Sequence, residues 1–279
     1  MLTSSVKNTA KNKISLFQQN PVNYKQFTGF CVLLFWLYSP LSHSEDCLSD
    51  RIDQYAIVSQ VYDGDTIKLK SGKKIRLIGV NTPEMNHKTG EPEPFAKQAK
   101  EYLQRKVLRK KVGLRYGSEK KDRHGRYLAH IFLNDQLNLQ QALLTKGLAV
   151  NISFPPNLWQ QECYADAEKS ARKNLKGIWK NHQKNIILAS RIKPSQSGFQ
   201  FIKGRISDIK QNKKAFWLNL STNRNKPVTL RIYKENLSYF KNVDIEKLEG
   251  KSIIAKGWIS RHKKHYYITI RHPSALQIL

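Results

Sequence analysis

Four short segments between Val61 and Arg126 combine acidic residues with arginines in a pattern that suits phosphate chemistry. They are residues 62–66 (YDGDT), 75–77 (IRL), 81–84 (NTPE) and 122–126 (DRHGR). Carboxylates bind divalent cations, and the planar fork of an arginine holds two oxygens of a phosphate group. A cation and paired arginines neutralise the charge that builds on the oxygens when a phosphodiester is attacked. The segments therefore predict metal-assisted cleavage of a phosphodiester.

The first two segments are predicted to meet on a β-hairpin. Two runs rich in β-forming residues, 66–70 and 73–80, flank a Ser-Gly pair, which is a hairpin signal. A two-residue turn at this pair makes Arg76 oppose Ile67. Asp65 and Arg76 then lie diagonally on one face of the sheet, where a carboxylate for the metal meets a guanidinium for the phosphate.

The third segment follows the strand that carries Arg76. Pro83 makes this turn rigid and holds Thr82 extended, which leaves the Thr82 carbonyl available to a cation. Carboxylate and carbonyl oxygens are hard ligands, which imply Ca²⁺ or Mg²⁺ and not zinc. The eight histidines are scattered, and the sequence has no His/Cys cluster that would argue for zinc.

Further helices and strands are predicted around these segments. Apolar residues recur every four positions across residues 94–108, which indicates a helix, and strands are expected at 111–116 and 127–133. Asn138, with a glutamine three residues later, has the form of a capping box and predicts a helix that ends at Gly147. Asn157 is predicted to open a third helix, which stops near residue 177.

The last third of the chain has a different pattern. Residues 181–197 are polar and basic and are predicted to be a linker before a second domain, residues 198–279. Five short strands with a brief helix between the third and the fourth suit a small OB-type barrel. The expected strands are 200–209, 215–220, 228–233, 252–260 and 266–271, with the helix near 236–241. The fold class is therefore mainly β with α.

In their order and residue types, the four segments resemble the staphylococcal nuclease (thermonuclease) family, over residues 55–179. The joint occurrence of four ordered motifs makes this match far more specific than any one of them alone. The resemblance implies a five-stranded OB-type β-barrel with three helices in residues 50–180. It also implies Ca²⁺ as the cofactor and cleavage of DNA and RNA that leaves 3′-phosphates.

The resemblance also implies a metal site. Asp65 matches a calcium ligand, Asn81 takes the place of a second carboxylate ligand, and Thr82 gives its backbone carbonyl. Asp63 matches an acid beside the metal. Asn81 departs from the family's usual acid, and a carboxamide keeps one oxygen ligand but removes a negative charge, so weaker Ca²⁺ binding is expected.

Three further residues are matched to the chemical step. Glu84 matches the residue that activates or orients the attacking water, and the residues themselves leave both roles open. Arg76 and Arg126 match the two arginines that hold the phosphate. Arginine suits this role because its fork stays protonated and holds two oxygens at once.

The overall charge agrees with a polyanionic partner. With 49 Lys+Arg against 21 Asp+Glu, the formal net charge is +28 and the sequence pI is about 10.0, which suits nucleic acid or an anionic membrane surface. DNA and RNA are the predicted partners, without a stable protein partner. Aromatic residues of the second domain, such as Trp217 and Trp258, are interleaved with cations and would serve either base stacking or core packing.

The first 44 residues read as a secretory signal. Lysines precede an apolar run, residues 27–38, that is shorter than a spanning helix needs. The expected location is therefore the periplasm or the outside of the cell. The alternative is an uncleaved signal that anchors the protein in the inner membrane. The same segment would also allow a transient association with the membrane. Cys47 and Cys163 would remain after cleavage and form a candidate disulfide, with two unrelated thiols as the alternative.

Three functional interpretations remain open at this stage. The first is an exported, Ca²⁺-dependent endonuclease that acts on DNA and RNA. The second is a nuclease-like module that binds nucleic acid with weak or absent catalysis, which Asn81 and the second domain favour. The third is a structural protein of the membrane surface, which explains the charge but leaves the four segments without a role.

Overall fold

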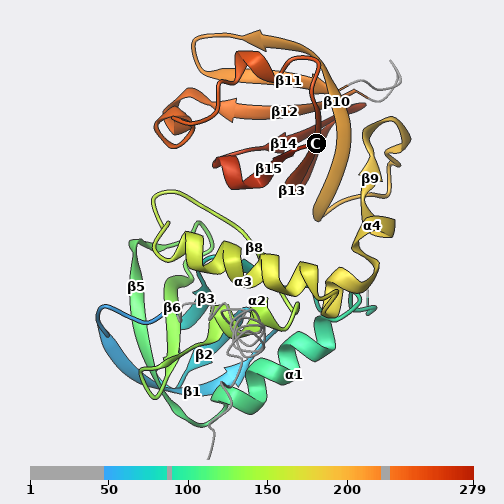
Figure 1. The fold of residues 1–279 in the computed structure, drawn as a ribbon. Coiled ribbons are helices and arrows are strands. Elements are labelled where there is room, and N and C mark those ends of the chain that lie inside the picture. Colours follow the sequence, from blue (N-terminus) through green and yellow to red (C-terminus); the bar gives the residue numbers. More distant parts are fainter. Residues whose placement is uncertain (1–46, 87–89, 221–226) are drawn as a thin grey trace, which may run out of the picture. The chain divides into compact units, whose positions relative to one another are not determined.

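The computed structural model describes residues 47–86, 90–220 and 227–279 (Figure 1). Residues 44–279 form one compact unit. The predicted signal, residues 1–44, lies outside the described residues. Among the residues that are described, no helix combines the length and the apolarity that a membrane crossing requires.

A closed five-stranded barrel forms the first half of this unit. Neighbouring strands pair in the order β3-β2-β1-β5-β6, and a parallel pairing of β3 with β6 closes the barrel. The strands are β1 (Gln54–Val61), β2 (Thr66–Leu69), β3 (Lys74–Leu77), β5 (Lys111–Lys121) and β6 (Tyr127–Leu133), with β7 (Leu137–Asn138) added at the edge. The predicted OB-type barrel is confirmed.

The register of the hairpin differs by one residue from the prediction. The expected pairing of Arg76 with Ile67 is wrong, because Arg76 pairs with Thr66. The carbonyl of Leu69 accepts a hydrogen bond from the N–H of Gly72 (2.9 Å), and Gly72 has a φ of +87°. The loop thus has three residues instead of two, and glycine tolerates the left-handed backbone that it needs.

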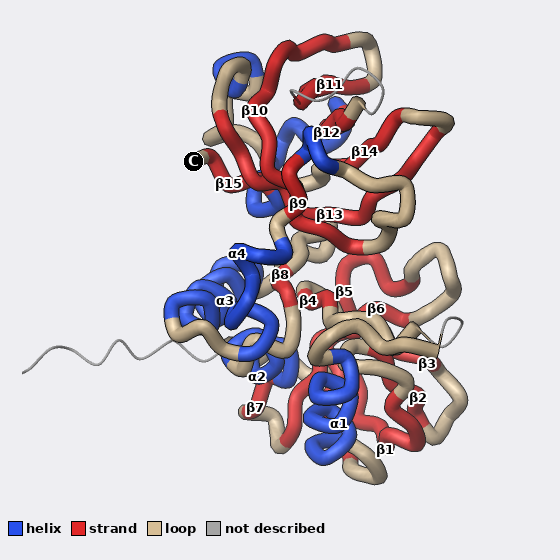
Figure 2. Tube along the Cα trace, turned by 90° about the vertical axis from the view of Figure 1, so that its right-hand side faces the viewer, coloured by secondary structure: helices blue, strands red, loops and turns tan. Residues whose placement is uncertain are grey.

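Three helices pack beside this barrel (Figure 2). They are α1 (Ala96–Val107), α2 (Leu139–Thr145) and α3 (Gln161–Lys173). The buried residues of α1 include Ala99 and Leu103, as the four-residue repeat predicted. Asn138 caps α2, since its side-chain oxygen accepts hydrogen bonds from the N–H groups of Gln140 (3.0 Å) and Gln141 (3.1 Å).

The start of α3 was predicted too early. Asn157 does not open the helix, which begins at Gln161. The side chain of Asn157 instead bonds the backbone of Glu119, accepting from its N–H and donating to its carbonyl at 3.0 Å each. An added Cβ at Gly117 would lie 2.5 Å from the Asn157 oxygen, so the glycine of β5 makes room for this bond.

A disulfide joins Cys47 to Cys163, which are 116 residues apart in the sequence. It attaches the segment before β1 to α3. The N–H of Cys47 also donates to the side-chain oxygen of Gln141 (3.2 Å), and Asn138 donates to the Cys47 carbonyl (2.9 Å). The beginning of the described chain is therefore fixed to both α2 and α3.

The second half of the unit contains a barrel with the same strand order. Pairing runs β10-β11-β12-β14-β13, β13 pairs with β10 to close the sheet, and β12 and β14 are parallel. The strands are β10 (Phe199–Gln211), β11 (Ala215–Leu220), β12 (Val228–Tyr233), β13 (Ser252–His262) and β14 (His265–Thr269), with β15 (Leu276–Ile278) at the edge. The five strands expected from the sequence are present. The helix expected at 236–241 is a 3-10 helix, η5 (Lys234–Tyr239).

Part of the predicted linker is structured. Residues 181–197 include α4 (His182–Asn185), β9 (Ile187–Leu188) and the 3-10 helix η4 (Ala189–Arg191). β9 pairs with β10, and Ala189 and Ile192 are buried in the core of the second barrel. Apolar residues among the lysines thus attach this segment to the second barrel.

Short elements complete the fold. β4 (Val80–Asn81) pairs with β8 (Val150–Asn151), outside the barrel. The 3-10 helices η3 (Gly177–Asn181), η6 (Glu246–Leu248) and η7 (Pro273–Ala275) lie in connections. At Gly147 and Gly177 the backbone after α2 contacts the start of η3. The N–H of Ile178 donates to the Gly147 carbonyl (2.9 Å), and a Cβ added to Gly147 would lie 2.2 Å from the carbonyl oxygen of Lys176.

This close approach predicts that Gly147→Ala lowers the free energy of unfolding by about 3 kcal/mol or more, because the methyl group meets a backbone carbonyl at a residue of positive φ. Gly72→Ala is the matched control: its φ is also positive, but no atom lies within 4 Å of the added Cβ, so a loss of about 1–2 kcal/mol is expected. Urea denaturation measures both. Equal losses in the two variants would contradict the prediction.

Candidate active site

Asp65 lies at the start of β2 with its carboxylate turned into the protein. The residue is 5% exposed. One carboxylate oxygen accepts hydrogen bonds from the N–H (2.8 Å) and the hydroxyl (3.0 Å) of Thr82, and the other accepts from the hydroxyl of Thr66 (3.2 Å). These bonds hold the third sequence segment against the first.

Arg76 of β3 contacts the same carboxylate. Its Nη2 lies 3.1 Å from the Asp65 oxygen that Thr82 also bonds, and both side chains are largely buried. The guanidinium also donates to the carbonyls of Leu77 and Val80 (2.9 Å each) and to the side-chain oxygen of Asn81 (3.2 Å). The contact that the sequence predicted between Asp65 and Arg76 is therefore present, although the strand register that led to it was wrong.

The glycine between the two acids of the first segment is required by packing. A Cβ added to Gly64 would lie 2.6 Å from the Cβ of Ala99 in α1 and 2.7 Å from Cγ2 of Thr82. The loop before β2 therefore lies directly between α1 and residue 82. The sequence pattern indicates no role for this glycine, and the tertiary contact reveals one.

The backbone of Asn81 is held by its pairing with strand β8. Asn81 pairs with Val150, and the next residue, Asn151, donates its N–H to Glu168 of α3 (2.8 Å). The carbonyl of Asn151 accepts from the Nζ of Lys256 in β13 (2.7 Å), which also lies 3.3 Å from Glu168. Lys256 and Glu168 are thus a buried ion pair, and burial lowers the pKa of the lysine.

Two further acids approach the buried carboxylate. Asp63 accepts a hydrogen bond from the N–H of Asp65 (3.0 Å), and burial together with the charge of Asp65 raises the pKa of Asp63 to about 7. Partial burial of its carboxylate, with the charge of Asp65 as the next cause, raises the pKa of Glu84. Three carboxyl groups therefore share one small region, where their negative charges disfavour one another.

The backbone of Glu84 is fixed to the segment before α1. Its N–H donates to the side-chain oxygen of Glu93 (2.9 Å), and its carbonyl accepts from the Glu93 N–H (2.9 Å). Glu84 as a whole residue remains exposed, although its carboxylate is partly buried. The charges of Arg76 and Arg126 partly oppose this rise in the pKa of Glu84.

Arg126 is oriented by Asp122 across a tight turn. Its Nε donates to one oxygen of Asp122 (2.7 Å), and the other oxygen accepts from the N–H groups of His124 (2.9 Å) and Arg126 (3.0 Å). Burial opposes ionisation of Asp122, but the bonds from Arg126 outweigh it and lower its pKa. Asp122 belongs to the fourth sequence segment, but this orienting role was not predicted for it. An acid four residues before an arginine across a glycine turn is a usable signal of such a role.

The donor set at this site consists of oxygen atoms. Within the described ranges, no group of three or more His, Cys, Asp or Glu side chains is arranged to hold a metal ion. The three predicted ligands are a carboxylate from Asp65, a carboxamide from Asn81 and a backbone carbonyl from Thr82. Two of them are therefore not His, Cys, Asp or Glu side chains. The structure brings all three residues together, through the hydrogen bonds of Asp65 and Arg76.

Comparisons with known proteins agree with this geometry. Residues 74–181 match the family model described as "Staphylococcal nuclease homologue". The chain is 38% identical to the thermonuclease of Staphylococcus hyicus over 137 residues, which is 48% of this chain and 80% of that protein. It is 36% identical to the thermonuclease of Staphylococcus intermedius over 126 residues, or 44% of this chain and 74% of that protein.

The chain belongs to the staphylococcal nuclease family. A second kind of relative is the endonuclease YhcR of Bacillus subtilis, 36% identical over 136 residues, which is 44% of this chain and 11% of that protein. The protein is accordingly a nuclease that hydrolyses phosphodiester bonds, and nucleic acid is its substrate. The resemblance found in the four sequence segments is confirmed.

Asp122 orients Arg126, so its removal tests how strongly the cleavage rate depends on the position of the Arg126 guanidinium. We expect Asp122→Asn to lower kcat/KM by about 10–100-fold, because the charge-assisted bond that orients the guanidinium is lost and small misplacements are costly. Asp244→Asn is a control, since Asp244 forms an exposed pair with Lys247 (2.9 Å). Steady-state cleavage rates measure both variants, and equal rates in Asp122→Asn and the unmodified protein would contradict the assigned role.

Proposed function

We propose that this nuclease is a Ca²⁺-dependent endonuclease that cleaves DNA and RNA, leaves 3′-phosphates and acts outside the cytoplasm. The observation that carries the proposal is the buried contact of Asp65 with Arg76 and Thr82, next to Glu84. This contact supports the roles proposed for Asp65 toward a cation and for Arg76 toward a phosphate, with Glu84 as the carboxylate for water.

The residues present fit a calcium ion. Hard oxygen donors of mixed type, from a carboxylate, a carboxamide and a backbone carbonyl, are the ligands that Ca²⁺ prefers. Burial, and after it the charge of Asp65, raises the pKa of both Asp63 and Glu84, and a bound divalent cation would offset the second of these causes. When bound, the cation would supply positive charge to the phosphate oxygens.

The protein's own residues supply the remaining parts of the reaction. Arg76 and Arg126 bind the phosphate oxygens and stabilise the charge that develops on them during attack. Glu84 orients a water molecule or accepts its proton at a carboxylate oxygen. The role of Arg76 depends on its bonds to Leu77 and Val80, which fix the guanidinium before substrate arrives.

The proposed substrate range follows from what the site contacts. Asp65, Arg76, Glu84 and Arg126 are suited to the phosphate and the cation, so the assigned residues read neither the base nor the sugar. Cleavage of both DNA and RNA is consistent with such a site. Export is supported by the lysine-rich, then apolar, first 44 residues and by the disulfide between Cys47 and Cys163, since disulfides persist in oxidising compartments.

The proposal predicts that digestion of plasmid DNA and of RNA requires Ca²⁺ and stops when a chelator is added. We expect Glu84→Gln to lower kcat by about 10²–10⁴-fold because the proton acceptor is lost, and Arg126→Ala to lower it by about 10²–10³-fold because one phosphate donor is lost. Gel-based cleavage assays with end-group analysis of the products measure the rates and the position of the phosphate.

Neighbouring residues of the same type provide the controls. Glu91→Gln and Arg123→Ala change exposed side chains in the two loops that carry Glu84 and Arg126, and they are expected to keep activity within about threefold. Cutting that survives the chelator would refute the metal requirement. Full activity in Glu84→Gln or Arg126→Ala would refute the assigned chemistry.

Because residue 81 is an asparagine, we expect weak calcium binding that a single substitution strengthens. In Asn81→Asp, a carboxylate replaces the carboxamide that now accepts from Arg76, so we expect Ca²⁺ to be bound roughly tenfold more tightly. Isothermal titration with Ca²⁺ and the calcium dependence of cleavage measure the change. An unchanged calcium midpoint in both measurements would show that residue 81 is not a ligand.

A further inference from the structure

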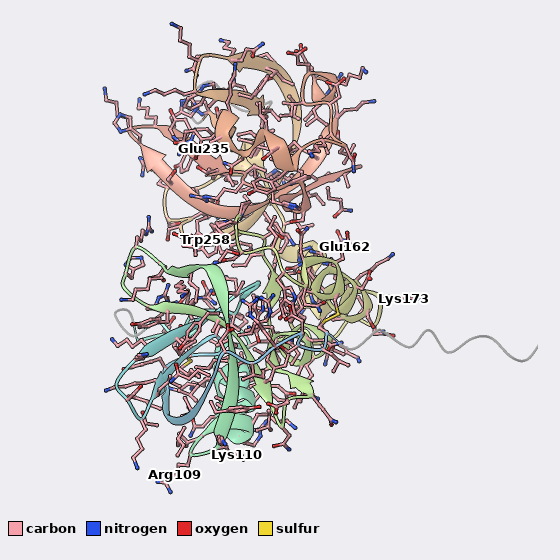
Figure 3. The ribbon with its side chains drawn as sticks, turned by 90° about the vertical axis from the view of Figure 1, so that its left-hand side faces the viewer. Arg109, Lys110, Glu162, Lys173, Glu235 and Trp258 are labelled. Atoms are coloured by element: carbon pink, nitrogen blue, oxygen red, sulfur yellow. A yellow bond between two sulfur atoms is a disulfide. The ribbon has the colours of Figure 1, made fainter. Side chains whose placement is uncertain are left out.

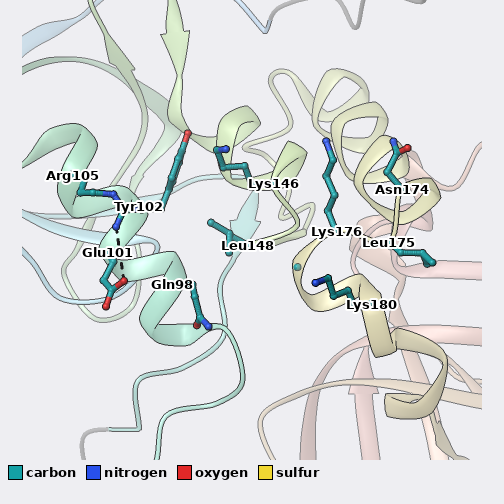
Figure 4. Close-up of a pocket in the computed structure, with 11 residues that line it drawn as sticks. Gln98, Glu101, Tyr102, Arg105, Lys146, Leu148, Asn174, Leu175, Lys176 and Lys180 are labelled. Carbon is teal, nitrogen blue, oxygen red and sulfur yellow. Dashed lines mark ion pairs between the residues drawn. The ribbon is translucent and has the colours of Figure 1, made fainter.

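A basic cleft lies between α1, the end of α2 and η3 (Figure 4). Its volume is about 520 Å³. Among its lining residues, four carry positive charge and one, Glu101, carries negative charge. The four cations, which we call the cleft cations, are Arg105, Lys146, Lys176 and Lys180. None of them belongs to the catalytic site described above.

The charge of the cleft cations is available to a ligand. All four residues are exposed. In the part of the chain that the structure describes, Lys146, Lys176 and Lys180 form no ion pair with an acid. Arg105 meets Glu101 at 3.9 Å, and both side chains are more than 60% exposed, so this pair neutralises little of the charge.

The backbone holds two of the cleft cations in place. Lys146 and Lys176 immediately precede Gly147 and Gly177, whose backbones touch, and the N–H of Ile178 donates to the Gly147 carbonyl (2.9 Å). The two lysines are thus carried by segments that cannot separate without breaking this contact. Lys146 is also positioned by the ring of Tyr102, with its Nζ 5.4 Å from the ring centroid.

The lining indicates what kind of ligand fits. Tyr102, the aromatic residue among those that line the cleft, is 8% exposed and therefore offers little ring surface to a base. Amino groups and a guanidinium bind phosphates, whereas base stacking needs accessible rings. The cleft is suited to a row of phosphates without regard to sequence.

Two residues that line the cleft are close in sequence to residues that pack against the active-site segments. Leu148, which lines the cleft, lies two residues before Val150, the partner of Asn81 in the β4–β8 pair. On the other wall, Gln98 precedes Ala99, which packs against Gly64. Leu148 is separated from Val150 by about 7 Å of extended chain, at about 3.3 Å per residue, and Gln98 from Ala99 by about 1.5 Å along the helix.

We propose that this cleft is a second binding site for the sugar-phosphate backbone of the substrate, which holds a single strand at a distance from the phosphodiester that is cut. The proposal rests on the nucleic acid substrate of the proposed function, but not on calcium or on cleavage. Long strands reach both sites, whereas strands of a few nucleotides reach only one. The cleft thus contributes affinity for long substrates and leaves the chemical step unchanged.

The test compares oligonucleotides of 4 and 20 nucleotides by fluorescence anisotropy in the presence of chelator, where no cutting is expected. Neutralising three cleft cations (Lys146→Gln, Lys176→Gln and Lys180→Gln together) should weaken binding of the 20-mer about tenfold at low salt. The slope of log K against log salt should decrease in magnitude by about 2, since each lost phosphate contact on a single strand removes about 0.7. Binding of the 4-mer should change less than twofold, and poly-dT and poly-dA strands should behave alike.

The matched control removes the same charge from α1 and α3, outside the cleft. Lys97→Gln, Lys169→Gln and Lys173→Gln together replace exposed lysines that do not line it, and Lys173 points away from the ribbon in Figure 3. This triple variant should keep most of its affinity for the 20-mer. An equal loss in both triple variants would reduce the effect to net charge and overturn the proposal.

Two more outcomes separate the alternatives. If the cleft variant binds phosphatidylserine vesicles less well but binds the 20-mer normally, the cleft serves a membrane surface and the proposal is wrong. If both triple variants bind the 20-mer as the unmodified protein does, the cleft is not a site.

With Ca²⁺ restored, a supported proposal also requires that KM of the cleft variant for long substrates rises while kcat is unchanged. Failure of the protein to cut at all would refute the proposed function but leave the binding result in chelator valid.

Discussion

The active site depends on one buried contact, between the carboxylate of Asp65 and the guanidinium of Arg76. An ionised pair in the interior is costly unless its remaining hydrogen-bonding groups are satisfied. Here Thr66 and Thr82 bond the carboxylate, while two backbone carbonyls and Asn81 accept from the arginine. The loop that carries Thr82 and Glu84 is therefore held by the groups that are proposed to act on the substrate. The hydrogen bonds of Asp65 and Arg76 therefore both stabilise the loop and position the catalytic groups.

The second barrel repeats the strand order of the first. Its clearest contribution is Lys256, which bonds the carbonyl of Asn151 and pairs with Glu168. Because Asn151 lies in the strand that pairs with β4, this lysine supports the backbone at Asn81. Trp258, which the sequence left between base stacking and core packing, is 39% exposed and contacts Phe154 and Phe199.

The positively charged residues of this very basic protein have different functions. Arg76 is largely buried with both of its Nη groups bonded, and Arg126 is oriented by Asp122, so both are directional groups. Arg109 and Lys110, by contrast, project outward from the turn between α1 and β5 (Figure 3). Cations of the second kind act through the general field, which raises the rate of encounter with a polyanion. The cleft cations are intermediate, since they are exposed but their backbone is fixed at Gly147 and Gly177.

The sequence alone determined the family, the barrel strands, α1 and the capped start of α2, because these follow from local patterns: residue alternation, a four-residue repeat and a capping asparagine. It also selected the residues that meet at the site. It failed at one local turn and at two places where a distant contact decided the outcome. The hairpin gained a residue at a glycine of positive φ, Asn157 bonded the backbone of Glu119 instead of capping α3, and part of the expected linker packed on the second barrel. Only the tertiary structure decided that Gly64 must be small, that Lys256 supports Asn81, and that four cations share one cleft, because each depends on elements remote in the sequence coming within contact distance.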